Sequence, residues 1–191
     1  MGLKLISPPA TYPISVADIK QQLKVDFTDD DDMIEALLKG AIAFCEKSTG
    51  RALIDQTWDY YVDAFPVGAI YIPRPPLIEV VGVFYTDAAG AEQEFAAASY
   101  LVDSASIKAR VSLAYGASWP SVQTVANAVR IRFRAGYLNT DSPPVANVPD
   151  DIITAIILRM KADYDDAPSA DKLRSTADIL LAHHRVLTGL A

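Results

Sequence analysis

The sequence predicts an α+β fold in which a small bundle of about four helices carries an inserted antiparallel β subdomain of five to seven short strands. Apolar residues recur with a helical period near both ends of the chain, and they alternate with polar residues through its middle. With 51% hydrophobic and 21% charged residues, the 191-residue chain has the composition of a globular protein. We therefore expect one compact domain with an insertion. Its expected parts are N-terminal helices within residues 1–55, the β insertion at 56–137, and C-terminal helices at 148–191.

Two helices are expected before the β insertion. Ser15 and the acidic residue three positions later form a pattern that resembles a capping box, which predicts a short helix over about 16–24. A strong helical stripe of apolar residues then predicts a helix over about 32–49, with Gly50 in the C-terminal cap. Cys45 lies on this stripe and is the only cysteine, so we expect a buried free thiol rather than a disulfide or a catalytic nucleophile.

The middle of the chain changes to the two-residue period of β-strands. Trp58 and Tyr60 alternate with Asp59 and Tyr61, which predicts a strand with one solvated face. Prolines and a turn signal at 87–90 separate the other candidates. The expected strands cover about 58–63, 70–72, 78–86, 92–95, 100–102, 107–113 and 128–135.

Two further helices are expected after the insertion. Pro149 and the two aspartates that follow it favour a helix start, and the helix over about 149–164 is apolar almost all round. Such a helix is normally covered on more than one side, so we place it in the core. A last helix is expected over about 171–188, ending at Gly189.

The motifs that would indicate catalysis or metal binding fail on spacing. The acidic run 29–32 lacks the glycine and glutamate of a calcium loop, so we interpret it as a helix start. His183 and His184 are adjacent and point about 100° apart on a helix, which does not suit one metal ion. Ser118 lacks the flanking glycines of a nucleophile elbow, and no glycine loop for phosphate is present. We therefore expect no catalytic residue, no metal and no cofactor, and hence no enzyme.

The charge distribution disfavours tight binding of nucleic acid. The net charge is −7, and residues 1–50, 51–137 and 138–191 carry −3, −1 and −3. The most apolar window, 152–160, is far shorter than the ~20 residues that a membrane span needs. The first residues also lack the pattern of a signal peptide. We expect neither membrane insertion nor secretion.

Three arginines form the most distinctive constellation. Arg130, Arg132 and Arg134 alternate with apolar residues, so their side chains share one strand face at ~6.6 Å spacing. We interpret this face first as the solvated side of an antiparallel sheet, and second as a contact with carboxylates of a neighbouring subunit, ahead of DNA phosphates. Other candidate interface residues are two tryptophans and the acidic end of a helix: Trp58, Trp119, Asp163, Asp165 and Asp166.

A series of short motifs runs along residues 5–160. It comprises Leu5-Ile-Ser-Pro-Pro9, Pro13-Ile-Ser-Val-Ala-Asp-Ile-Lys20, Ser48-Thr-Gly-Arg-Ala-Leu53, Gln56-Thr-Trp58, Pro73-Arg-Pro-Pro-Leu77, Tyr115-Gly116, Trp119-Pro120, Ala135-Gly-Tyr137 and Val148-Pro149. In this order and spacing the motifs resemble the head–tail connector, or adaptor, proteins of tailed bacteriophages, in the form with a β insertion between helices. From Asp163 onward the chain departs from that pattern, in which a tyrosine-containing helix end with nearby arginine is expected.

The resemblance implies a non-enzymatic structural protein of the virion neck. Such proteins form a ring, commonly of about twelve subunits, under the portal of a DNA-filled capsid. The ring extends the DNA channel and docks the next neck or tail-completion protein. The implied partners are other copies of the chain, the portal protein and that next protein. DNA passes without sequence-specific binding, and assembly occurs in the host cytoplasm, from a phage or a prophage.

A head-to-tail ring needs two different complementary faces on each subunit. The arginine face and the acidic helix ends form one candidate pair. Two alternative functions remain open from the sequence. A small enzyme with an unrecognised site predicts a polar pocket with perturbed pKa values, and a phage or prophage DNA-binding module predicts salt-sensitive binding of DNA.

Overall fold

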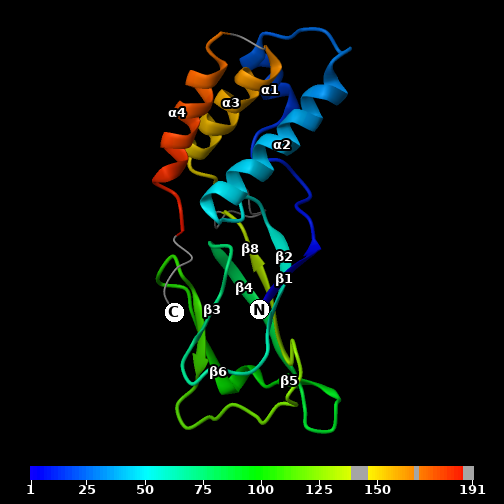
Figure 1. Ribbon diagram of the computed structural model, residues 1–191, viewed down its shortest axis with the longest axis vertical. Helices are drawn as coiled ribbons and strands as arrows, with labels where there is room; N and C mark the ends of the chain where they lie inside the picture. Colours follow the sequence, from blue (N-terminus) through cyan, green and yellow to red (C-terminus); the bar gives the residue numbers. More distant parts are fainter. Residues whose placement is uncertain (139–145, 166–167, 187–191) are drawn as a thin grey trace. The chain divides into compact units, whose positions relative to one another are not determined.

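The computed structural model describes residues 1–138, 146–165 and 168–186 (Figure 1). The described residues contain four α-helices, eight β-strands in two antiparallel sheets and one short 3-10 helix, which confirms the α+β fold class. Contacts between residues divide the chain into two compact units. The sheet unit comprises Met1–Ala10 and Ile54–Leu138, and the helical unit comprises Thr11–Leu53 and Asn139–Ala191.

The helical unit contains all four helices, each close to its predicted position. They are α1 (Val16–Leu23), α2 (Asp31–Thr49), α3 (Asp150–Tyr164) and α4 (Ala170–Ala182). The Ser15 hydroxyl accepts a hydrogen bond from the backbone N–H of Asp18 at 3.0 Å, so the predicted cap of α1 is confirmed. Gly50 follows α2 in the left-handed region with φ +72°, as its predicted capping position requires.

Helix α3 lies at the centre of the helical unit. It packs against α1, α2 and α4, which confirms that a helix with an apolar surface almost all round is covered on several sides. Its buried residues include Ile152, Ile156 and Met160, and α2, against which it packs, buries Leu38 and Cys45. Burial in this apolar setting raises the pKa of the Cys45 thiol to about 12.

We expect the Cys45 thiol to be unreactive in the folded protein. A thiol with a pKa near 12 stays protonated at neutral pH, and its full burial blocks the approach of a reagent. Titration with a thiol-specific chromogenic reagent should therefore release colour only after denaturant is added. Stoichiometric reaction within seconds under native conditions would contradict the packing described for α2.

The predicted end of the last helix is wrong. Helix α4 ends at Ala182, whereas the sequence predicts helix up to residue 188. The next segment is held against the C-terminal end of α2 by two hydrogen bonds. Arg51 Nε donates to the carbonyl of His184 at 2.6 Å, and the backbone N–H of Val186 donates to the carbonyl of Thr49 at 2.8 Å. These tertiary bonds replace the bonds of a continued helix. The predicted stop at Gly189 lies outside the described residues.

The sheet unit contains two antiparallel sheets. The five-stranded sheet has the order β1-β2-β8-β4-β5, and the three-stranded sheet has the order β3-β7-β6. The strands are β1 (Gly2–Ser7), β2 (Gln56–Val62), β3 (Ile70–Tyr71), β4 (Leu77–Thr86), β5 (Glu92–Phe95), β6 (Tyr100–Asp103), β7 (Arg110–Leu113) and β8 (Val129–Ala135), with the 3-10 helix at Ala97–Ser99. Seven of them lie within residues 56–137, as the sequence predicts for the insertion.

Strand β1 is not predicted by the sequence. Its residues include Leu3, Leu5 and Ile6, which are partly exposed and follow no strict alternation. The strand forms because β2 offers an open edge, along which Leu5 pairs with Trp58. This pairing places the first residues of the chain in the sheet unit. The predicted domain boundaries themselves stay a prediction.

The centre of the five-stranded sheet is β8. Its Val129, Ile131 and Phe133 are fully buried on one face, so the predicted alternation is confirmed. The aromatic rings of the same unit form a cluster around Phe65 and Phe95. Trp119 and Tyr100 have ring centroids 5.3 Å and 6.0 Å from Phe95.

Candidate functional site

The arginine ladder, defined as Arg130, Arg132 and Arg134, occupies the face of β8 opposite its buried residues. The antiparallel register decides which side chains the ladder meets. Asp59 of β2 lies directly opposite Arg132, and Glu79 of β4 lies directly opposite Arg134. Because paired residues share a sheet face, Arg132 and Arg134 each meet a carboxylate on an adjacent strand, whereas Arg130 lies opposite Tyr61 and Phe84.

Asp59 is the most buried carboxylate of this face, with only 2% of its surface exposed. Arg132 donates to it in bidentate geometry, Nε to Oδ1 and Nη2 to Oδ2, both at 2.8 Å. Arg130 Nη1 lies 3.5 Å from the same carboxylate. Burial alone would raise the pKa of Asp59, but the hydrogen bond from Arg132 and the charges of both arginines outweigh it, so the pKa is lowered.

The two ends of the ladder are paired as well. Arg134 binds Asp55, and its Nη1 donates to Glu79 at 2.5 Å. These two hydrogen bonds raise the pKa of Arg134. Arg130 donates to Glu92 at 2.9 Å, and its guanidinium lies 4.1 Å from the ring centroid of Phe84.

The ladder is therefore neutralised within its own sheet. Three guanidinium groups face four carboxylates, those of Asp55, Asp59, Glu79 and Glu92, so this set of seven side chains carries a net charge of −1. An anionic ligand would have to displace these carboxylates before it reached an arginine. Through these ion pairs the arginine ladder joins β2, β8, β4 and β5. The predicted role of the ladder in contacting a neighbouring subunit stays a prediction.

The two tryptophans named from the sequence are half-buried. The guanidinium of Arg74 lies 5.3 Å from the ring centroid of Trp58 on β2. Trp119 stacks on Phe65 with ring centroids 4.5 Å apart and an interplanar angle of 6°. Both indole N–H groups are buried without a hydrogen-bond partner among the described residues. Both rings thus pack inside the sheet unit, and their role in an interface stays a prediction.

The acidic residues at the end of α3 lie in the helical unit. Asp163 accepts two hydrogen bonds from Arg174, the shorter at 2.8 Å. Asp165 follows the last helical residue and is exposed. Asp166 lies outside the described residues. Asp163 thus has an intramolecular partner in α4. Asp163 and Asp165 belong to the helical unit, whereas the arginine ladder belongs to the sheet unit.

The acidic run at the start of α2 also has a local role. Asp31 pairs with Lys20, and the carboxylate of Asp30 accepts a hydrogen bond from the hydroxyl of Tyr164 at 2.8 Å. Across residues 1–138, 146–165 and 168–186, no group of three His, Cys, Asp or Glu side chains is arranged to hold a metal ion. In the same part of the chain no helix combines the length and apolarity of a membrane span.

Sequence reasoning did not identify Asp59 as the centre of the arginine network. The available signal was its alternation with Trp58 and Tyr60, from which the sequence predicts a solvated face, but the structure corrects this prediction, because Asp59 is buried beneath the arginines. The register between β2 and β8 was missing. Without that register, the sequence does not show that Asp59 faces Arg132, 73 positions later.

The comparisons with solved structures find the same fold in gene transfer agent particles. The chain is 24% identical to a chain in the neck of an empty particle computed with C6 symmetry, with a TM-score of 0.75. It is 24% identical to a chain in the virion of a native particle (TM-score 0.77) and 25% identical to one in a native neck computed with C12 symmetry (TM-score 0.73). Each likeness covers 100% of this chain and 98% of the other.

The comparison with protein families gives a match over more than half of the sequence. The matching family model is described as "Phage gp6-like head-tail connector protein", and it matches residues 13–116, which include α1, α2 and strands β2 to β7. No curated protein matches the chain. The resemblance stated from the sequence motifs is confirmed by the family match. The chain therefore belongs to the family of phage gp6-like head–tail connector proteins.

Proposed function

We propose that the chain forms a ring in the neck of a phage-like particle, between the portal and the next neck or tail-completion protein, and that the ring continues the DNA channel. The family match over residues 13–116 carries this proposal. The fold likeness to chains from particle necks, over essentially the full length of both chains, supports it. The C6 and C12 symmetries with which those necks were computed favour a ring of six-fold or twelve-fold order.

The electrostatics of the chain suit a channel wall rather than a DNA-binding surface. The net charge is −7, and the arginine ladder is neutralised by carboxylates of its own sheet. A surface that attracts phosphates would slow the passage of DNA, whereas an acidic or neutral surface lets it pass. This supports a structural role without sequence-specific DNA binding.

The proposal is tested by removing the chain from the particle. Particles assembled without it should have DNA-filled heads that lack tails, because the docking surface for the next neck protein is missing. Purified chain added to these heads should restore tail attachment, as counted by negative-stain electron microscopy. Tailed, transfer-competent particles formed without the chain would overturn the proposed function.

The acidic end of α3 remains a proposed contact with a neighbouring subunit. Charge reversal of the arginine ladder is a poor test of this subunit contact. It would place new negative charges beside the buried carboxylate of Asp59 and so destabilise the sheet itself. Asp165→Lys is a cleaner change, since Asp165 is exposed and a cation at a helix C-terminus is favourable for stability. We expect this variant to keep its melting temperature and to assemble less well on the portal. Unchanged assembly, measured by sedimentation with portal particles, would remove Asp165 from the interface.

A further inference from the structure

Two uncharged segments meet in the sheet unit. Residues 64–73 and 111–129 contain no Asp, Glu, Lys or Arg, although 21% of the whole chain is charged. Phe65 of the first segment stacks on Trp119 of the second with ring centroids 4.5 Å apart, which fixes the two segments to each other. The core of a protein interface is typically poor in charged residues and rich in aromatic residues, as these two segments are.

The second segment holds one tyrosine entirely in solvent. Tyr115 is fully exposed at 107% of its reference surface, a value that is shared by Val67 in the first segment. The turn that carries Tyr115 is closed by a hydrogen bond from the N–H of Ala117 to the carbonyl of Ala114 at 3.0 Å, with Gly116 at φ +78°. This turn is pre-organised, so docking its aromatic ring costs little conformational entropy.

Residues 122–126 of the second segment form a shallow hollow of about 480 Å³ together with two residues where the first segment begins. It is lined by Asp63, Ala64, Val122, Gln123, Thr124, Val125 and Ala126. Hydrogen bonds hold its wall in place. The N–H of Gln123 donates to the carbonyl of Thr86 at 3.0 Å, and the N–H of Asn127 donates to the carboxylate of Asp63 at 2.8 Å. Four aliphatic side chains suit an aromatic ring, and Gln123 and Thr124 supply partners for a phenolic hydroxyl.

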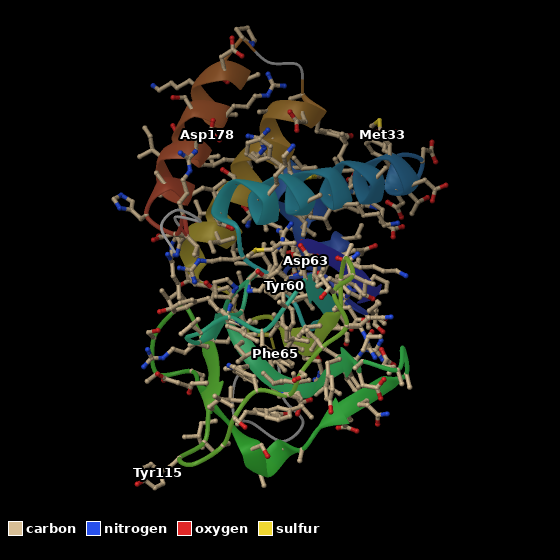
Figure 2. The ribbon with its side chains drawn as sticks, turned by 60° about the horizontal axis from the view of Figure 1, so that its bottom comes forward. Met33, Tyr60, Asp63, Phe65, Tyr115 and Asp178 are labelled. Atoms are coloured by element: carbon tan, nitrogen blue, oxygen red, sulfur yellow. The ribbon has the colours of Figure 1, made fainter. Side chains whose placement is uncertain are left out.

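The exposed side chain of Tyr115, here called the knob, does not reach the hollow of its own copy. Figure 2 shows Tyr115 at the outer end of its loop, directed away from Asp63 and Phe65. A projecting side chain and a separate hollow on the same unit of each copy suit a head-to-tail contact between copies. We propose that Tyr115 of one copy inserts into the hollow at residues 122–126 of the next copy in the ring. This inference rests on the proposed function and names one of its subunit contacts.

A second copy fits this surface better than nucleic acid does. The hollow and the knob are both uncharged apart from Asp63, so the two surfaces match in polarity, whereas DNA binding needs cations. Both features also belong to the same unit. Each copy thus carries the two different faces that a closed ring requires.

The first experiment measures ring assembly of single variants on purified portal particles. Tyr115→Ala should weaken assembly about tenfold, as expected when a central aromatic anchor is truncated. Thr124→Arg, which places a long charged side chain across the hollow, should do the same. Leu101→Ala is the control, because Leu101 is exposed and uncharged but lies outside the two uncharged segments, and it should assemble like the wild-type chain. Circular dichroism should show the same melting temperature for all three.

The second experiment maps the contact directly. Tyr115 is replaced by the photoreactive analogue p-benzoylphenylalanine, and rings are assembled from isotopically light and heavy copies before irradiation. We expect light-to-heavy cross-links from position 115 to residues 122–126. Normal ring assembly of Tyr115→Ala, or cross-links from position 115 to a portal or neck protein, would contradict the insertion of Tyr115 into the next copy. Either result would leave the proposed ring itself unaffected. Absence of any ring with the wild-type chain would overturn both proposals.

Discussion

Replacing Gly136 with alanine is expected to lower the free energy of unfolding by about 4 kcal/mol or more. Gly136 follows β8 with φ +144°, a conformation that residues with a Cβ rarely adopt. A Cβ at this position would lie 2.5 Å from the backbone nitrogen of Asp55 and 2.5 Å from the carbonyl oxygen of Ile54. Neither backbone atom can move away cheaply, because both directly precede β2, whose first residue Gln56 pairs with Ala135 beside Gly136.

Chemical denaturation followed by tryptophan fluorescence measures this effect, with Trp58 and Trp119 as reporters in the sheet unit. Gly40→Ala is the control, because Gly40 lies inside helix α2 and an added Cβ meets nothing within 4 Å. That change should raise stability by about 0.5–1 kcal/mol through helix propensity alone. If Gly136→Ala lost less than about 1 kcal/mol, the close approach of Gly136 to the start of β2 would be incorrect.

Asp59→Asn is expected to destabilise the protein by about 3 kcal/mol at pH 7. The change keeps the shape of the side chain but removes its charge. It leaves Arg132 and Arg130 without their shared carboxylate in a site where Asp59 is 2% exposed. Glu92→Gln is the matched control: Glu92 also pairs with Arg130, but its side chain is 62% exposed, so its loss should cost at most about 1 kcal/mol.

The same carboxylate predicts a pH dependence of stability. The folded-state pKa of Asp59 is lowered, so the stability it contributes is present above its unfolded pKa of about 3.9 and is lost as the pH falls through the folded pKa. The stability difference between the wild-type chain and Asp59→Asn should therefore be constant from pH 7 to 5 and shrink below about pH 4. Denaturation curves at several pH values measure it, and a difference independent of pH down to 2.5 would contradict the assigned role.

The helices and most strands could be predicted because their signals are local. The apolar stripe of α2, the cap at Ser15 and the alternation of β8 each depend on residues within a few positions of one another. Strand β1 and the end of α4 were not predicted correctly. Both depend on partners that are distant in the sequence, since β1 needs the edge of β2 and residues 183–186 need the end of α2.

The candidate surfaces show the same limit. The sequence predicts that three arginines share a face, and they do, but it does not show that their carboxylate partners come from β2, β4 and β5. Similarly, the sequence contains Tyr115 among many aromatic residues and does not distinguish it from the buried ones. Its exposure follows from a turn at Gly116 and from the Phe65–Trp119 stack, which only the tertiary fold brings together.

The most direct test of the connector function is the mass of the portal particle with and without the chain. Native mass spectrometry of the purified portal mixed with excess chain should show a discrete complex that is heavier by a whole ring of 20.7 kDa subunits, with six-fold or twelve-fold order. Intermediate occupancies should be rare, because each added subunit creates the face for the next. A portal whose mass is unchanged by saturating chain would contradict the proposal that this protein is the ring beneath it.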